Sequence, residues 1–235
     1  MLAIYKKEMR SYFTSVIGYV FLVLYLALSG AVFCYSTLFS MSSDVTTFYT
    51  FMLIISSVVL PLLTMKSFSE ERKAKTEQLL LTSPVSIISI VSGKFLAAYT
   101  VFSACMVLNS LYFFFLASYT SLKVAVLIGN LVAILLVGMV YISIGLFVSA
   151  LTENQLSAAI GTIAIILGFL LIGFVGSLIP SEYAVRYVFD FISIFTRFQA
   201  FTAGYLDVAS LIYYISVSFI FLYLTVRIYD RRRYS

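Results

Sequence analysis

The chain has 235 residues, of which 62% are hydrophobic and 11% are charged, and its formal net charge is +5. Soluble domains carry about 25% charged residues, so this composition, with a mean hydropathy of +1.07, excludes an ordinary water-soluble protein. The sequence contains no histidine, which excludes histidine nucleophile activation, histidine metal ligands and histidine proton relays. The basic residues cluster beside apolar runs, where membrane orientation explains them, so we expect no nucleic-acid partner.

The first apolar run, Phe13–Phe39, follows the basic residues Lys6, Lys7 and Arg10. It is longer than the apolar region of a secretory signal peptide. We therefore interpret it as an uncleaved first membrane span.

Six apolar segments are each long enough to cross a hydrocarbon core of ~30 Å. They are Phe13–Phe39, Phe48–Met65, Ser89–Ser118, Leu122–Leu151, Gln155–Ile179 and Val208–Ile228. Backbone groups inside the membrane need partners within their own segment, and no alternating barrel pattern is present. The sequence therefore predicts an all-α integral membrane protein whose residues 1–235 form a single domain.

The distribution of basic residues predicts the orientation of these spans. Only Lys123, Arg186 and Arg197 would lie outside the cell, and the other twelve of the fifteen Lys and Arg would lie inside. The positive-inside rule then places both termini in the cytoplasm. No predicted span has a charge at its centre, and this argues against transport driven by protons, for which intramembrane ionisable groups are usual.

The loop between the second and third spans, residues 66–88, concentrates charge between two apolar segments. We interpret Ser69–Leu81 as a short helix with Ser69 as its N-cap, and Lys73 and Glu77 are spaced to pair on its surface. Composition alone favours an interfacial helix that merely anchors the chain. The turn at Glu153 and Asn154 is a second candidate contact, for which a plain turn is the favoured interpretation.

The order of residues in this loop is more informative than its composition. It runs Ser69-x-Glu71-Arg72-x-x-x-Thr76-Glu77-x-Leu79-Leu80-x-Thr82-x-Pro84, followed by Gly93-Lys94. This order resembles the cytoplasmic loop of ABC-2-type transporter permeases, although Lys75 stands where that family commonly has Gly. The start, from Tyr5 to Phe13, resembles the gliding-motility-type subgroup, although Val16 stands where that subgroup often has Pro.

The resemblance implies a six-span permease with an elbow helix at 1–12 and a coupling helix in the loop at 66–88. That helix would dock into a separate ATPase subunit. The implied docking residues are Glu70, Glu71, Arg72, Thr76, Glu77, Leu79 and Leu80. The chain has no phosphate-binding loop of the Gly-x-x-x-x-Gly-Lys-Ser/Thr type, so ATP and Mg would be bound by the partner ATPase, and we expect no cofactor, metal or catalytic residue in this chain.

A stripe of small residues in the fifth span would let another helix approach closely. Its members are Ser157, Gly161, Ala164 and Gly168. Packing within the chain and packing against a second permease are equally compatible with it. The resemblance favours the second permease, as a homodimer or a heterodimer. Ser56, Ser57 and Thr64 would line a translocation path if the second span faced the dimer centre.

Residues 180–207 interrupt the apolar pattern with charges and several Phe residues, which predicts external amphipathic helices. An aromatic belt at the interface is the favoured interpretation, and an outer gate for an amphipathic substrate is the alternative that the resemblance implies. The resemblance also implies export across a bacterial cytoplasmic membrane, with an accessory membrane protein as a further candidate partner beside the lipid bilayer. A stand-alone secondary transporter or channel remains the alternative function, and the sequence does not identify the substrate.

Overall fold

The computed structural model describes residues 1–42, 44–78, 85–119, 124–179, 184–202, 204 and 207–234. The helices in chain order are α1 (Leu2–Thr14), α2 (Val16–Phe33) with a π-helical turn (Cys34–Phe39), α3 (Val45–Thr64), α4 (Lys66–Lys73), α6 (Ile87–Ala117), α7 (Val124–Leu151), α8 (Gln155–Leu178), α9 (Ala184–Ile192), α10 (Ile194–Thr202) and α11 (Val208–Tyr234). The described residues contain no strand. The prediction of an all-α protein is confirmed.

Six of these segments are long and apolar enough to cross a membrane. They correspond one to one to the six predicted spans, with α2, α3, α6, α7, α8 and α11 as their helices. The first and last residues of the helices differ by a few positions from those of the predicted spans, because capping residues decide where a helix begins or ends and hydropathy does not show them. Asp44, for example, accepts a hydrogen bond from the backbone N–H of Thr46 and so starts α3 before the predicted Phe48.

Helix α7 is the centre of the bundle and packs against α3, α6, α8 and α11. Close approach is possible because small residues face its neighbours. A methyl group on Gly138 would lie 1.9 Å from the ring of Phe102 in α6, and one on Gly145 would lie 2.1 Å from Oγ1 of Thr64 in α3. Helices α2, α6, α8 and α11 expose many large apolar side chains, as lipid-facing helices do. The core therefore lies between α3, α6 and α7.

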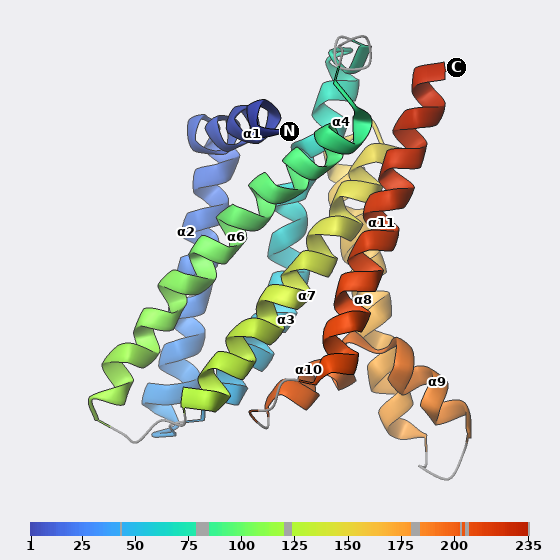
Figure 1. Cartoon of the computed structure of the whole chain (residues 1–235). Helices are drawn as coiled ribbons and strands as arrows, with labels where there is room; N and C mark the ends of the chain where they lie inside the picture. The colour runs from blue at the N-terminus through green and yellow to red at the C-terminus, as the bar shows by residue number, and fades with distance from the viewer. Residues whose placement is uncertain are drawn as a thin grey trace.

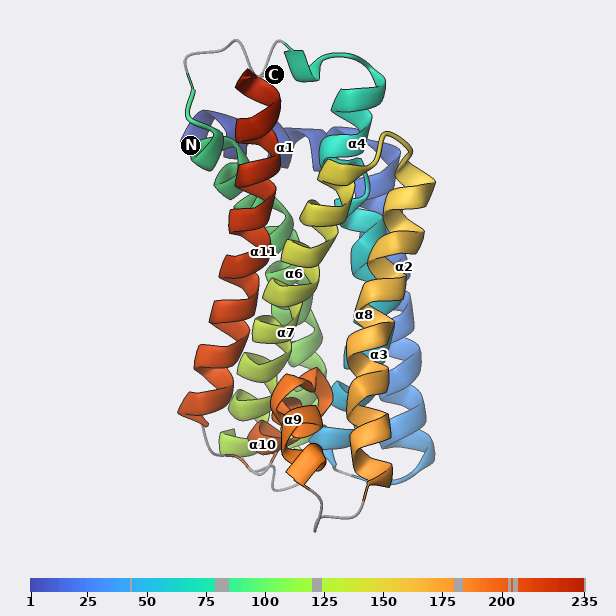
Figure 2. The same ribbon diagram turned by 90° about the vertical axis from the view of Figure 1, so that its right-hand side faces the viewer.

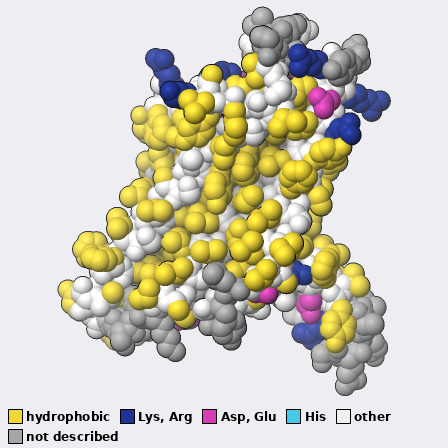
Figure 3. All heavy atoms as spheres, viewed as in Figure 1, with side chains coloured by type: hydrophobic (Ala, Val, Ile, Leu, Met, Phe, Trp, Pro, Cys, Tyr) yellow, Lys and Arg dark blue, Asp and Glu magenta, His cyan; other side chains and the backbone are white. Residues whose placement is uncertain are grey.

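The two ends of the bundle differ in charge. Both termini, the crosswise helix α1 and α4 lie at one end, which we call the terminal end, and α9 and α10 lie at the opposite end (Figures 1 and 2). Hydrophobic side chains cover most of the long face of the bundle seen in Figure 3, and Lys and Arg gather at the terminal end of that face. This placement brings α1, α4 and the end of α11 together although they are far apart in the sequence.

The chain turns sharply between α1 and α2. Ser15 adopts an extended conformation, and its hydroxyl accepts a hydrogen bond from the backbone N–H of Gly18, which caps α2. A Cβ on Gly18 would lie only 1.9 Å from the carbonyl oxygen of Tyr12. The absence of a side chain at Gly18 is thus what lets α1 lie across the end of α2 and α6.

Candidate functional site

Helix α4 begins directly where α3 ends, and the structure corrects the predicted start of this segment. The helix spans Lys66–Lys73 with Met65 at its N-cap position, and Ser69 is buried in its middle, so the prediction that Ser69 is an N-cap is wrong. The physical reason lies in α7. The hydroxyl of Ser149 accepts hydrogen bonds from the backbone N–H groups of Phe68 and Ser69, each at 3.1 Å, and donates to the carbonyl of Met65.

A side chain from another helix therefore satisfies the backbone groups that a break in the helix leaves without partners. No local cap is needed where Ser149 supplies the acceptor. The result is that α4 continues from the second span with its start fixed on α7.

The end of α4 is a Schellman C-cap. The N–H of Lys75 donates to the carbonyl of Arg72, and the N–H of Thr76 donates to the carbonyl of Glu71, which is the hydrogen-bond pattern of that motif. Lys75 occupies the left-handed position with a φ of 57°, where glycine is the residue without a steric cost. The geometry thus explains why Gly suits the position at which this chain has Lys.

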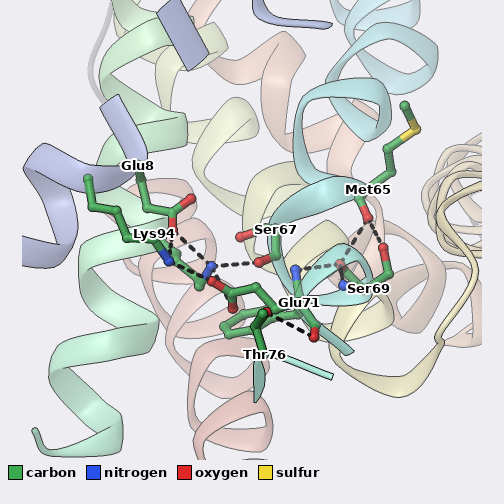
Figure 4. A network of polar contacts seen from close by, with 10 residues as sticks. Glu8, Met65, Ser67, Ser69, Glu71, Thr76 and Lys94 are labelled. Carbon is green, nitrogen blue, oxygen red and sulfur yellow. Dashed lines mark hydrogen bonds and ion pairs between the residues drawn. The ribbon is translucent and has the colours of Figure 1, made fainter. Parts of the chain in front are cut away.

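Glu71 joins a buried ionic cluster at the terminal end, formed with Lys7 and Glu8 of α1 and Lys94 of α6. The Nζ of Lys94 lies 3.0 Å from Oε1 of Glu8 and 3.0 Å from Oε2 of Glu71. Lys7 lies 2.9 Å from the other oxygen of Glu71. Figure 4 shows Lys94 pointing between Glu8 and Glu71, with both carboxylates turned toward it.

The cluster shifts the ionisation of its most exposed member. Partial burial lowers the pKa of Lys7, but the hydrogen bond and the charge of Glu71 outweigh it, so the pKa of Lys7 lies above its ordinary value. Lys7 therefore keeps its charge under physiological conditions and supports Glu71.

Arg72 connects α4 to the turn between α7 and α8. Its guanidinium lies 2.9 Å from Glu153 and donates to the carbonyl of Leu151. The next residue, Asn154, accepts a hydrogen bond from the N–H of Leu156 and caps α8. The turn at Glu153 and Asn154 is thus both a helix cap and a partner of the loop.

Glu77 pairs with the C-terminal part of α11 rather than with Lys73 as its spacing suggested. Its carboxylate lies 3.0 Å from the guanidinium of Arg232, which also donates to the carbonyl of Ala150 at the end of α7. The rings of Phe68 and Tyr229 pack against each other beside this pair, with centroids 4.7 Å apart. Helix α11 therefore continues past the predicted end of the last span at Ile228, because its basic end has partners in the loop.

These contacts separate the predicted docking residues into two groups. Glu71, Arg72 and Glu77 point into the protein and pair with α1 and α6, with the α7–α8 turn and with α11. Glu70 and Thr76 are exposed, together with Lys73, Ala74 and Lys75 between them. We call residues 70 and 73–76 the outer face of the loop. Leu79 and Leu80 lie outside the described residues.

Sequence reasoning missed Lys94 and Ser149 as parts of this site. Lys94 entered the sequence analysis in the count of basic residues and at the end of the loop motif, but not as a partner of the loop. Its signal was present, because it is the one charge within the long apolar segment of the third span. Ser149 gave no signal, since a serine within a helix can also bond to the backbone of that helix.

The polar residues predicted to line a path are buried inside the chain. Ser56 shares a hydrogen bond of 2.8 Å with the hydroxyl of Tyr25 in α2. Ser57 donates to the carbonyl of Ile54, and Thr64 donates to the carbonyls of Leu60 and Pro61. In this conformation none of the three is exposed, so a path along them stays a prediction and would require α3 to move.

The small-residue stripe of α8 is largely open to the surroundings of the chain. Ser157 and Ala164 are exposed, and a methyl group on Gly168 would meet no atom of the described residues within 4 Å. Gly161 differs, because a methyl group there would lie 3.0 Å from Val148. Three of the four members are thus free to contact another molecule.

At the opposite end of the bundle, a cavity of about 490 Å³ lies between α3, α8, α9 and α10. Its walls are mostly apolar, with Ile54 of α3 and Leu171 and Phe174 of α8 among them, and Arg186 and Asp190 of α9 pair at 3.3 Å on its rim. The volume falls within the range of small-molecule sites, about 300–1,000 Å³. Residues 184–202 thus form short helices against the ends of the spans, in the region expected to be amphipathic.

Comparison with known proteins adds one finding. The family model for ABC-2 family transporter proteins matches residues 35–229. This range begins in the first span and ends in α11, so it includes the whole of the loop described above. No curated protein sequence matches the chain.

Proposed function

This chain belongs to the ABC-2 transporter family, and from that premise we propose that it is the permease subunit that couples ATP hydrolysis by a separate ATPase to substrate export. It is a multi-pass membrane protein with six apolar helices, and the coupling would run through the loop at α4. ATP and Mg would be held by the ATPase. The start of the chain, from Tyr5 to Phe13, supports placement in the gliding-motility-type subgroup.

The observation that carries this proposal is the arrangement of the loop. Its outer face is free for a partner, while its inward residues pair with three separate parts of the membrane bundle. Glu71 is bound to α6, Arg72 to the α7–α8 turn and Glu77 to α11. A partner that pushed on α4 would therefore act on several spans at once, as ATP-driven closure of an ATPase pair requires.

The end of the bundle that carries α4 would face the cytoplasm. Lys6, Arg10 and the Arg231–Arg233 run lie at this terminal end, and the positive-inside rule places such residues on the cytoplasmic side. Both termini would then be cytoplasmic, and α1 would be the elbow helix on the membrane surface. A bacterial cytoplasmic membrane is the location that this bias and the family support.

A second permease, identical or related, would complete the transporter. The exposed stripe of α8 offers the close approach that such pairing needs, and the cavity beside α3 and α8 would lie next to the joined faces. An amphipathic substrate would leave there, after α3 had moved and opened a path along Ser56, Ser57 and Thr64. An accessory membrane protein is a further candidate partner.

The test is to purify the tagged chain from its native membrane in mild detergent and identify the proteins that accompany it. We expect an ATPase with a phosphate-binding loop and measurable ATP hydrolysis. Thr76→Arg combined with Lys73→Glu changes two exposed side chains, of which Thr76 also donates to the carbonyl of Glu71. It leaves the inward ion pairs of the loop in place and should reduce ATPase recovery about tenfold or more. Lys6→Glu, an exposed charge reversal on α1, is the matched control.

The outcome separates the two functions under consideration. Loss of the ATPase in the loop variant, with retention in the control, would support the permease proposal. A chain that is reproducibly free of any ATPase would overturn it. Transport by that chain in liposomes without an ATPase would then favour the stand-alone transporter or channel.

A further inference from the structure

We propose that Lys94 is a positioning residue that joins α1 to α4, so that α1 follows each movement that the ATPase imposes on the loop. This inference rests on the proposed function and deepens it, because it names the residue through which the motion reaches the N-terminal helix. Lys94 itself lies near the start of α6 and is not part of the outer face of the loop.

The Lys94 ammonium has three polar partners, and these come from two other helices. It donates to Glu8 of α1 at 3.0 Å and to the carbonyl of Ser67 in α4 at 2.6 Å, and it forms an ion pair with Glu71 of α4 at 3.0 Å. The ring of Phe68 lies 4.9 Å from the same nitrogen. An ammonium has three donors and no acceptor, and all three of these polar partners belong to α1 and α4 (Figure 4).

Burial makes this joint stronger than the other link between the same helices. The side chain of Lys94 is 1% exposed, and those of Glu8 and Glu71 are 11% and 15% exposed. The direct pair between α1 and α4 in the described part of the chain, Lys7 with Glu71, includes a lysine that is 60% exposed. Exposed pairs contribute little, whereas separating a buried pair leaves a charge without compensation.

A movement of α4 away from α1 would therefore leave the Lys94 ammonium, or one of the carboxylates of Glu8 and Glu71, buried without its ion-pair partner. A movement that keeps all three contacts must carry α1, α4 and the start of α6 together. The family match begins at residue 35 and does not include α1, so the assignment of α1 to the moving part comes from these contacts alone.

Hydrogen–deuterium exchange of the purified complex with its ATPase measures whether α1 and α4 respond together to nucleotide, and it needs no label at the docking surface. Peptides from residues 2–14 and 66–73 are followed with no nucleotide and with ATP plus vanadate. In the wild-type complex we expect both peptides to change on nucleotide binding. In Lys94→Met, residues 66–73 should still respond, whereas residues 2–14 should no longer respond and should exchange about tenfold faster or more in both states.

Three variants distinguish a coupling role from a merely structural one. Lys94→Arg keeps the cation and should restore the response of α1, since a cavity of about 210 Å³ beside the cluster provides room. Lys6→Met removes a neighbouring exposed charge of α1 and should change nothing. If Lys94→Met does not fold, Glu8→Met removes the partner of Lys94 on α1, leaves its contacts with Glu71 and Ser67 of α4 and should abolish the same response.

Two results would overturn the proposal. The first is a wild-type complex in which nucleotide changes α4 but not α1. The second is a Lys94→Met or Glu8→Met complex in which α1 still responds to nucleotide. Failure to recover any ATPase with the wild-type chain would instead refute the proposed function, so the two failures are distinguishable.

Discussion

The guanidinium of Arg232 lies 3.0 Å from the carboxylate of Glu77, although 155 residues of sequence separate them. Arg232 also donates to the carbonyl of Ala150 at 2.8 Å. One side chain of the last helix thus connects the loop after the second span with the end of the fourth span. Because both partners are largely shielded from solvent, this connection holds the loop in place.

We first predict that Arg232→Met destabilises the protein by about 1.5–3 kcal/mol, the usual range for hydrogen bonds to charged groups. Glu77→Arg should be at least as harmful, because it places two cations together. The double variant Glu77→Arg with Arg232→Glu should recover part of the loss. Melting can be followed with a thiol-reactive dye, since Cys105 is buried, in a Cys34→Ser background. Equal melting of Arg232→Met and the parent would refute this prediction.

A variant at Glu77 therefore changes the fold of the loop as well as any docking. This matters for the interpretation of binding experiments, because lost ATPase recovery in Glu77→Arg would not by itself identify a docking residue. Variants of the outer face, at residues 73 and 76, leave the three inward ion pairs intact.

The second prediction concerns Lys75, whose φ of 57° lies in the left-handed region. A residue with a Cβ loses roughly 1–2 kcal/mol in that conformation, so Lys75→Gly should stabilise the loop by about 1 kcal/mol. Lys73→Gly, two residues earlier within α4, should instead cost about 1 kcal/mol. The thiol-dye melting curves of the two variants should move in opposite directions. A lower melting temperature for Lys75→Gly would contradict the assigned C-cap.

The sequence predicted the six spans because each is a long apolar segment whose length matches the membrane. It also predicted which loop carries the charge that matters. It did not predict the ion-pair partners of these charges. Glu71, Arg72 and Glu77 pair with residues of other elements, up to 155 residues away in the sequence. The spacing of residues predicts which side chains can pair on one helix, but it contains no information on contacts between distant segments.

The failure of the predicted N-cap has a similar cause. Ser69 followed by acidic residues is a usual start for a helix, but the backbone groups at this start already have an acceptor in Ser149 of α7. The hydrogen-bond acceptor at this helix start thus comes from a tertiary contact with α7 and not from a local cap. Only the packing of α3 against α7, which Gly145 permits, brings Ser149 to that position.

The third prediction tests this role of Ser149. Ser149→Ala leaves the backbone N–H groups of Phe68 and Ser69 buried without their acceptor, and we expect a loss of about 1–3 kcal/mol. Ser143→Ala is the matched control, because Ser143 lies in the same helix, is equally buried and donates to the carbonyl of Val140 in its own helix. Its loss should be about 1 kcal/mol or less. Similar melting temperatures for the two variants would argue against the assigned role.

The fourth prediction concerns the turn between α1 and α2. Gly18→Ala would place a methyl group 1.9 Å from the carbonyl oxygen of Tyr12, so α1 must shift, at a cost of about 1–3 kcal/mol. Gly30→Ala, in the same helix, meets only the Tyr112 hydroxyl at 3.7 Å and should be neutral or slightly stabilising. Melting curves compare the two, and faster hydrogen exchange in residues 2–14 of Gly18→Ala alone would locate the effect. Unchanged exchange there would refute it.

The fifth prediction tests the proposed pairing of two permeases through α8. A Cβ at Gly168 would meet no atom of the described residues within 4 Å, so we expect Gly168→Leu to change the stability of the single chain by no more than about 0.5 kcal/mol. In a helix pair that depends on close approach, the same side chain separates the backbones and weakens association, by about tenfold or more if 1.4 kcal/mol or more of packing is lost. Ala104→Leu, at an exposed position of α6, is the control. Recovery of a differently tagged permease copy, its own or a related one, measures the pairing. Undiminished recovery with Gly168→Leu would exclude this face of α8 from the interface, because the bulk of a leucine cannot be accommodated where two backbones are in contact.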